Sequence, residues 1–184
     1  MVINNMKNIW HDFNKKRINS NDFFACIEIP KGSKKKYELD KETGMIILDR
    51  VLYTSTIYPA NYGFIPLTYA EDKDPLDVLV LCQETLDPLV LVRVKPIGLI
   101  TMTDEKFEDS KIIAVPFGDP EYSCYDDIHD LPSHLFEEIR HFFSVYKQLE
   151  LKETEVKDIL GHEDAIDCVQ RAINAYTQKF GNEE

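Results

Sequence analysis

Four carboxylates crowd one segment of seven residues, 71–77 (EDKDPLD), which is followed at once by an apolar run at 78–82. Like charges this close together repel one another unless a cation is held between them. Oxygen ligands suit hard divalent cations, and Mg²⁺ usually takes a few carboxylates together with water and substrate phosphate. The segment therefore indicates either a divalent-cation site or a solvated acidic turn.

An EF-hand calcium loop is excluded by register. Counted from Asp72, the sixth position, which requires Gly, is Asp77, and the twelfth, which requires Glu, is Gln83. A cation site in this segment must therefore be of another kind.

A second acidic segment, residues 104–111 (DEKFEDSK), separates the apolar runs 97–102 and 112–117. This spacing predicts a hairpin with the acidic segment in the loop at its end. If both acidic segments lie at one mouth of a barrel, six or more carboxylates face a shared space. That composition is typical of a multi-metal site; the alternative is that acids simply accumulate in polar loops.

One arginine occurs in unexpected surroundings. Arg50 alternates with Ile46, Leu48 and Leu52, which predicts that it lies on an apolar strand face. An arginine there must be satisfied by an anion, either a phosphate or a carboxylate such as Glu28 or Glu38 of a neighbouring strand.

Further polar side chains have spacings that let them share a space with Arg50. Lys36 and Glu38 share one face of a strand, and Glu28 alternates with apolar residues. Tyr58 and Tyr62 place two phenols in a turn-rich strip. Taken singly, exposed salt bridges and ordinary aromatic packing explain these residues as well as ligand binding does.

The elements that must position these groups are mainly strands. Short apolar runs rich in β-branched residues alternate with turn signals at 23–29, 45–53, 78–82, 89–94, 97–102 and 112–117. Long helical patterns do not separate them, so parallel βαβ units are not expected, and closing an antiparallel sheet removes its edges. The pattern predicts a small closed antiparallel β-barrel.

The C-terminal third reads as two helices. Six apolar residues from Leu135 to Leu149 recur at helical spacing, and a second helix is predicted from about His162 to Lys179. We expect both helices to cover one side of the sheet.

Length and charge limit the class of protein. A chain of 184 residues with 43% hydrophobic side chains predicts a single domain, residues 1–184. The net charge of −12 disfavours binding to nucleic acid or anionic lipid. No secretory or membrane-spanning pattern occurs, so the expected location is cytoplasmic.

Motifs along the chain resemble one known family. They are EIP at 28–30, KYE at 36–38, DR at 49–50, YPANYG at 58–63, DKDPLDV at 72–78, MTDE at 102–105, EDSK at 108–111 and HFFSVYK at 141–147. In this order they resemble the soluble family I inorganic pyrophosphatases of bacterial type, over about residues 23–179. Lys73 stands where that family usually has Gly, Ser, Asn or Asp.

The resemblance implies an OB-like barrel of five strands flanked by helices, and hydrolysis of pyrophosphate to two phosphates. It implies several Mg²⁺ ions per active site, with Mn²⁺ as a substitute, and a homohexamer. Asp72, Asp77 and Asp109 would bind the first metal, Asp77 would bridge to a second, and Asp104 with Asp109 would hold a further metal.

The resemblance also implies roles for the remaining site residues. Asp74 would be the general base. The contacts to phosphate would come from Lys36, Arg50, Tyr62, Lys111, Tyr146 and Lys147. Supporting roles would fall to Glu28, Glu38 and Tyr58.

Two other functions fit parts of the pattern. An OB-type nucleic-acid-binding module would also be a small barrel with tyrosines at its mouth, but here the aromatic strip leads into acids rather than bases. A divalent-cation-binding protein without turnover would use the same carboxylates, but it leaves Lys36 and Arg50 unexplained.

Overall fold

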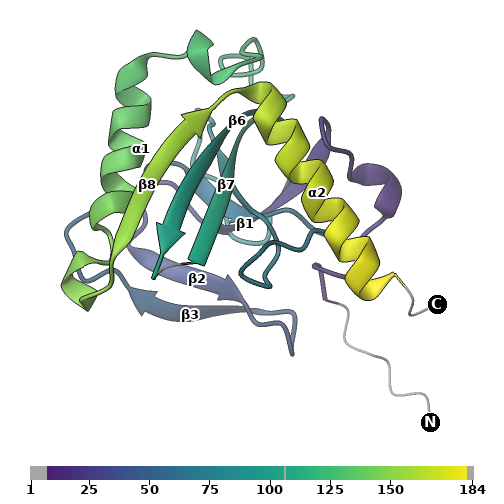
Figure 1. Ribbon diagram of the computed structural model, residues 1–184, viewed down its shortest axis with the longest axis horizontal. Coiled ribbons are helices and arrows are strands. Elements are labelled where there is room, and N and C mark those ends of the chain that lie inside the picture. The colour runs from purple at the N-terminus through teal and green to yellow at the C-terminus, as the bar shows by residue number, and fades with distance from the viewer. Residues whose placement is uncertain (1–7, 106, 182–184) are drawn as a thin grey trace.

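The computed structural model describes residues 8–105 and 107–181 (Figure 1). The strands are β1 (Phe23–Ile29), β2 (Lys35–Leu39), β3 (Ile46–Val51), β4 (Asn61–Phe64), β5 (Asp77–Val80), β6 (Leu91–Asp104), β7 (Phe107–Pro116) and β8 (Thr154–Leu160). The helices are α1 (Ser133–Val145) and α2 (His162–Phe180), with short 3₁₀ turns η1 (Lys15–Arg17), η2 (Ile128–Asp130) and η3 (Gln148–Glu150). The mainly β prediction with two C-terminal helices is confirmed.

Five strands close into a ring. Their order is β1-β4-β5-β7-β6, and β1 also pairs with β6 through Phe23–Cys26 and Leu91–Val94. The expected antiparallel pairing is wrong at one place, because β5 and β7 run parallel, with Asp77 opposite Lys111. A ring with an odd number of strands cannot alternate in direction all the way round, so one pair must be parallel.

The strand β6 joins two apolar runs that the sequence pattern separates. Its register shifts between Pro96 and Gly98, where a bulge accommodates a proline that has no N–H to donate. Its second half pairs with both β7 and β8.

The second acidic segment is correspondingly not the loop that was predicted. β6 extends to Asp104 and β7 begins at Phe107, so Asp109 lies on a paired strand opposite Met102. Lys106, also in this segment, lies outside the described residues. The polar strand β8, which shows no apolar alternation in the sequence, pairs with β6 and extends the sheet.

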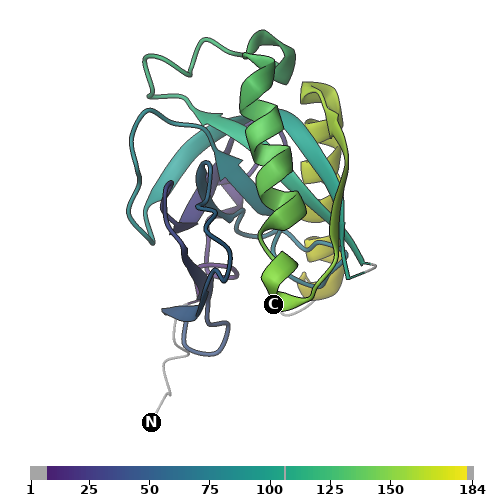
Figure 2. The same cartoon turned by 90° about the vertical axis from the view of Figure 1, so that its left-hand side faces the viewer.

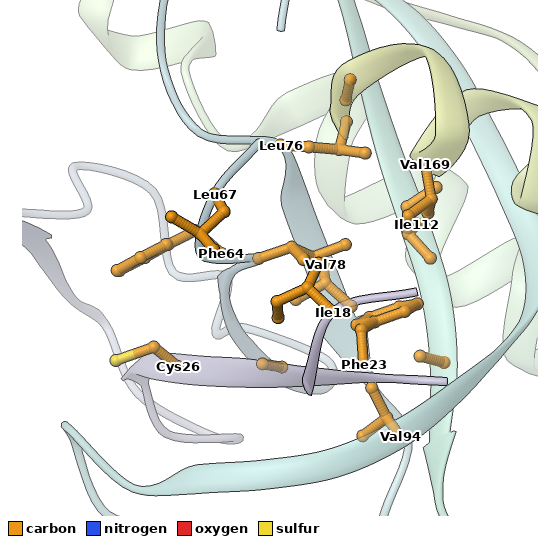
Figure 3. Close-up of a cluster of buried hydrophobic side chains, with 14 of the residues drawn as sticks. Ile18, Phe23, Cys26, Phe64, Leu67, Leu76, Val78, Val94, Ile112 and Val169 are labelled. Atoms are coloured by element: carbon orange, nitrogen blue, oxygen red, sulfur yellow. The ribbon is translucent and has the colours of Figure 1, made fainter. Parts of the chain in front are cut away.

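The two helices pack on opposite faces of the sheet, which corrects the expectation that both cover one side. Val78 and Ile112 belong to the same buried cluster as Val169 of α2, and Figure 3 shows Val169 beside Ile112. Leu79 and Ile113, one residue further along each strand, belong to the cluster that contains α1. In Figure 2 α1 lies in front of the strands and α2 behind them.

The ends of the helices differ little from the prediction. Leu149, expected on the apolar stripe of the first helix, lies in η3 and is exposed, because α1 ends at Val145.

The hairpin β2–β3 forms a separate sheet of two strands. Within the described part of the chain, no helix has the length and apolar character needed to cross a membrane.

Candidate active site

A cavity of about 290 Å³ opens where β4, β5, β6 and β7 approach the hairpin β2–β3 and the end of α1. Among the described residues, the sequence-predicted members that line it are Glu28, Lys36, Glu38, Tyr62, Asp72, Asp74, Asp77, Asp104, Asp109, Lys111, Tyr146 and Lys147. The two predicted members outside its lining are Arg50 and Tyr58. The structure thus brings both acidic segments and the lysines into one space.

Lys111 is the most deeply buried charged group of this cavity. The parallel register of β5 and β7 sets it opposite Asp77, and its Nζ lies 2.7 Å from Asp77 Oδ2 and 2.8 Å from Asp109 Oδ1. Burial alone would lower the pKa of Lys111, but Asp109 and Asp77 outweigh burial and hold that pKa well above its usual value. Lys111 is therefore a permanent cation between two carboxylates.

The carboxylates around Lys111 outnumber it, so its single positive charge does not balance their negative charge. Burial, followed by repulsion from Asp77, raises the pKa of Asp72 to about 6. Burial also raises the pKa of Asp109, although Lys111 opposes the shift. Raised carboxyl pKa values indicate that this cavity favours the addition of positive charge.

Tyr62 points its hydroxyl at the same carboxylate as Lys111. The hydroxyl donates to Asp77 and accepts from Lys111 Nζ at 3.1 Å. Burial, and then Asp77, raise the pKa of Tyr62 well above its ordinary value, so the phenol stays protonated and remains a donor. Tyr58 is buried behind it, with ring centroids 5.3 Å apart, and supports Tyr62 from outside the cavity.

A close approach of two strands fixes the position of Tyr62. A Cβ atom at the next residue, Gly63, would lie only 1.9 Å from the carbonyl oxygen of Cys26 on β1. Only glycine allows β4 to pair with β1 at this distance. The position of the backbone beside Tyr62 therefore depends on residue 63 being a glycine, which has no Cβ atom.

The far side of the cavity is built by the ends of β6 and α1. Lys147, which follows α1, forms an ion pair with Asp104, the last residue of β6. The other carboxylate oxygen, Asp104 Oδ1, is buried and lacks a hydrogen-bond partner among the described residues. Tyr146 is buried at the end of α1, and burial above all raises its pKa well above the usual range.

The hairpin β2–β3 and β1 supply the third wall. Lys36 forms ion pairs with Glu38 and with Asp49, the latter at 3.3 Å, and burial lowers the pKa of Lys36. Glu28 accepts a hydrogen bond from the Leu39 N–H at 2.7 Å. Burial, and then Asp77, raise the pKa of Glu28 to about 8, so its carboxyl is largely protonated at neutral pH.

Arg50 does not lie on the apolar face that its sequence neighbours suggested. Leu48 is 54% exposed, and a register shift makes Asp49 an extra residue, which breaks the alternation. The guanidinium pairs with Asp49 and places its Nε 3.0 Å from Glu150 Oε1, rather than binding the expected carboxylates of β1 and β2.

Sequence reasoning missed six residues of the cavity lining: Trp10, Tyr37, Leu39, Lys41, Phe64 and Pro75. Trp10 and Lys41 are the two that do not lie within or directly beside the predicted site motifs. Lys41 lies in the turn between β2 and β3 and forms an ion pair with Asp74. A lone lysine in a charged turn carries no distinctive signal, and Trp10 stands in a segment without a motif. Only the folded arrangement of distant segments brings them to the site.

The donor chemistry of the site fits hard cations. Within residues 8–105 and 107–181, no three His, Cys, Asp or Glu side chains are arranged around a common metal position. Lysines instead contact Asp77, Asp104 and Asp109. Carboxylate oxygens are the ligands that Mg²⁺ prefers, and one of them, Asp104 Oδ1, has no hydrogen-bond partner among the described residues. The raised pKa of Asp72 indicates that a cation beside this carboxyl would be favourable.

The ring of strands and this cavity together define a class of small β protein whose pocket combines several carboxylates with several lysines. The family model described as inorganic pyrophosphatase matches residues 25–177. The chain belongs to the inorganic pyrophosphatase family.

Individual relatives agree with this assignment. "Soluble inorganic pyrophosphatase 2" of Chlamydomonas reinhardtii is 49% identical, with 93% of this chain and 89% of the relative covered. "Soluble inorganic pyrophosphatase 1" of Arabidopsis thaliana is 48% identical, with 92% and 80% covered. The crystal structure of inorganic pyrophosphatase from Thermus thermophilus is similar with a TM-score of 0.85 at 40% identity, covering 94% of this chain and 99% of that chain.

Proposed function

We propose that this protein hydrolyses inorganic pyrophosphate to two orthophosphates, with Mg²⁺ as the working metal and Mn²⁺ as a substitute. The observation that carries the proposal is the charge of the cavity, in which seven carboxyl groups face four lysines. A pyrophosphate anion cannot bind beside this excess of carboxylates unless cations bind with it. Membership of the inorganic pyrophosphatase family supports the same substrate.

The proposed metal ligands are Asp72, Asp77, Asp104 and Asp109, with Asp77 shared between two metals. When bound there, Mg²⁺ supplies an acidified water and neutralises charge on the substrate. Tyr62 and Lys111 hold the Asp77 carboxylate through the contacts described above, so its direction is fixed before a cation arrives.

Asp74 is the proposed general base. It lines the cavity, and its backbone N–H donates to Asp72 Oδ1 at 3.1 Å, which ties it to a proposed metal ligand. Asp74 accepts a proton as the water oxygen bonds to one phosphorus atom and the bridging P–O bond breaks.

Cationic and phenolic side chains are proposed to bind the phosphates. They are Lys36, Arg50, Tyr62, Lys111, Tyr146 and Lys147, supported by Glu28, Glu38 and Tyr58. As the bridging bond breaks, the lysine ammonium groups stabilise the charge that grows on the leaving phosphate. A cation-binding protein without turnover does not account for the four lysines that share the cavity with the carboxylates. An acidic pocket disfavours nucleic acid.

Phosphate release tests the proposal. We expect release from pyrophosphate in Mg²⁺ and its loss when EDTA is added, with recovery when excess Mg²⁺ is restored. Turnover that continues in EDTA would refute the metal-dependent mechanism, and binding of Mg²⁺ without any release would favour a cation-binding protein.

We further propose that residues 1–184 act as one domain, that six copies assemble into a homohexamer, and that the protein works in the cytoplasm. Mass photometry of the purified protein tests the assembly, because a hexamer has six times the 21.4 kDa mass of the chain. Cell fractionation with antibody detection tests the location.

A further inference from the structure

Lys41 lies at the tip of the hairpin β2–β3, and its ammonium contacts the carboxylate of Asp74, 33 residues away in the chain. Asp40 fixes the turn around it: Asp40 N–H donates to Met45 O at 2.8 Å, and Gly44 N–H donates to Asp40 O at 2.7 Å. The backbone that carries Lys41 is therefore well defined.

Residues 8–12, which we call the N-terminal strap, hold this turn from outside. Asn8 is buried, and its Nδ2 donates to Lys41 O at 2.7 Å while its Oδ1 accepts from Trp10 N at 2.9 Å. Trp10 is anchored to the chain that follows β4, where its Nε1 donates to Thr68 O at 2.8 Å. The strap thus bridges the hairpin and the segment that leads to Asp74.

The N-terminal strap also restricts the conformations open to the Lys41 side chain. Its Nζ lies 5.6 Å from the centroid of the Trp10 ring, within the range of a cation–π contact. An ion pair between two half-exposed side chains contributes little by itself, because both must give up conformational freedom. The fixed turn and the indole reduce that loss for Lys41.

The pocket lysines divide according to the carboxylates they contact. Lys111 and Lys147 contact proposed metal ligands, and Lys36 contacts Glu38 and Asp49. Lys41 contacts Asp74, the proposed base. Its position therefore suits a role in directing the base.

We propose that Lys41 is a positioning residue that orients the Asp74 carboxylate, and that the N-terminal strap sets Lys41 in place. This inference rests on the role of Asp74 in the proposed function. A base that already points in one direction accepts its proton in the productive geometry more often than a freely rotating carboxylate does. Lys41 acts through Asp74 and makes no contact with substrate in this role.

Steady-state kinetics at saturating Mg²⁺ tests the proposal. For Lys41→Met we expect kcat to fall roughly threefold to tenfold with KM for pyrophosphate within about twofold of wild type. Lys41→Arg should recover most of the loss, because it keeps a cation at the turn. Asn8→Asp, which keeps the acceptor for Trp10 N but loses the donor to Lys41 O, should lower kcat in the same direction.

Lys35→Met is the matched control, since Lys35 is an exposed lysine of the same hairpin outside the cavity lining. It should keep the wild-type kcat. Thermal unfolding of every variant, followed by circular dichroism, checks that each one is folded under the conditions of the assay.

A double-mutant cycle decides whether Lys41 works through Asp74. In an Asp74→Asn background, Lys41→Met should produce no further fall in the residual kcat. An equal fall in both backgrounds, a rise confined to KM, or a wild-type kcat in Lys41→Met would each overturn the inference while leaving the proposed function intact. A wild-type protein that fails to hydrolyse pyrophosphate would overturn the proposed function, and this inference with it.

Discussion

At the scale of single residues, the site is a set of carboxylates held in place by cations and phenols of the same chain. Asp77 illustrates this arrangement, because it contacts both Tyr62 and Lys111 at the centre of the cavity. Asp74 lies nearer the rim, where its side chain is half-exposed and contacts Lys41. The two acids share one short segment but have different surroundings.

Replacing these two acids separates their proposed roles. We expect Asp77→Asn to weaken Mg²⁺ binding roughly 10-fold to 100-fold, since a shared ligand loses its charge. Asp74→Asn should weaken binding much less, because the base touches water. Calorimetric titration with Mg²⁺ measures both, and an equal loss of affinity would show that the two roles are wrongly assigned.

Glu28 provides a test based on protonation. Its pKa is raised to about 8, mainly by burial, so between about pH 4.5 and pH 8 the folded state binds a proton that the unfolded state has released. The contribution of Glu28 to the free energy of unfolding is therefore greatest below pH 4.5. It falls as the pH rises above 4.5 and is lost once the pH has passed through 8.

Glu28→Gln should accordingly flatten the fall in stability between pH 5 and pH 9. Urea unfolding in EDTA measures the effect, which should amount to a few kcal/mol at pH 9 at most. A difference between wild type and variant that stays constant with pH would contradict the shifted pKa.

Prediction of site residues from the sequence succeeded where several reactive side chains are close together in the chain. The four acids in residues 71–77 indicate a site even without knowledge of the fold. It was less successful where local geometry intervenes, because the extra residue Asp49 breaks the alternation on which the placement of Arg50 depended. Lys41 reaches the site through a contact with a segment 33 residues away, which local sequence cannot show.

At the scale of elements, the pairing of strands sets the positions of the site residues. The parallel pair β5–β7 places Asp77 opposite Lys111, and β4 lies on the other side of β5 with Tyr62 opposite Leu79. The sequence predicted most of the buried strands from their apolar runs. It did not reveal β4, whose four residues read as a turn, or the polar strand β8, because pairing with neighbours stabilises both.

The contact between β1 and β4 can be tested at Gly63. Gly63→Ala would force a Cβ against the Cys26 carbonyl, so we expect a loss of several kcal/mol of stability or failure to fold. Gly118→Ala is the matched control, since the added Cβ would meet no described atom within 4 Å beyond Gly118 and its two chain neighbours. Thermal unfolding of both measures the difference, and equal melting temperatures would contradict the close approach.

At the scale of the whole molecule, net charge and the acidic cavity act together. A chain with a charge of −12 and a pocket with excess carboxylates should be stabilised by cations that bind the folded state alone. Mg²⁺ at about 100 times its Kd adds about 2.7 kcal/mol to the free energy of unfolding. For a chain of this size, that corresponds to a rise in Tm of roughly 5–10 °C.

Differential scanning calorimetry measures this rise. NaCl at matched ionic strength should raise Tm less, because it screens charge without occupying the site. Asp77→Asn should abolish most of the Mg²⁺ effect. Equal shifts from the two salts would show that general screening, and not the cavity, is responsible.

The buried Trp10 has one more consequence. It is the single tryptophan of the chain, so emission excited at about 295 nm comes almost entirely from its indole, which lines the cavity and faces Lys41. The wild-type protein therefore carries an intrinsic optical probe beside its own active site. Stopped-flow fluorescence during mixing with Mg²⁺ or pyrophosphate would follow events at this wall in real time, without an attached dye.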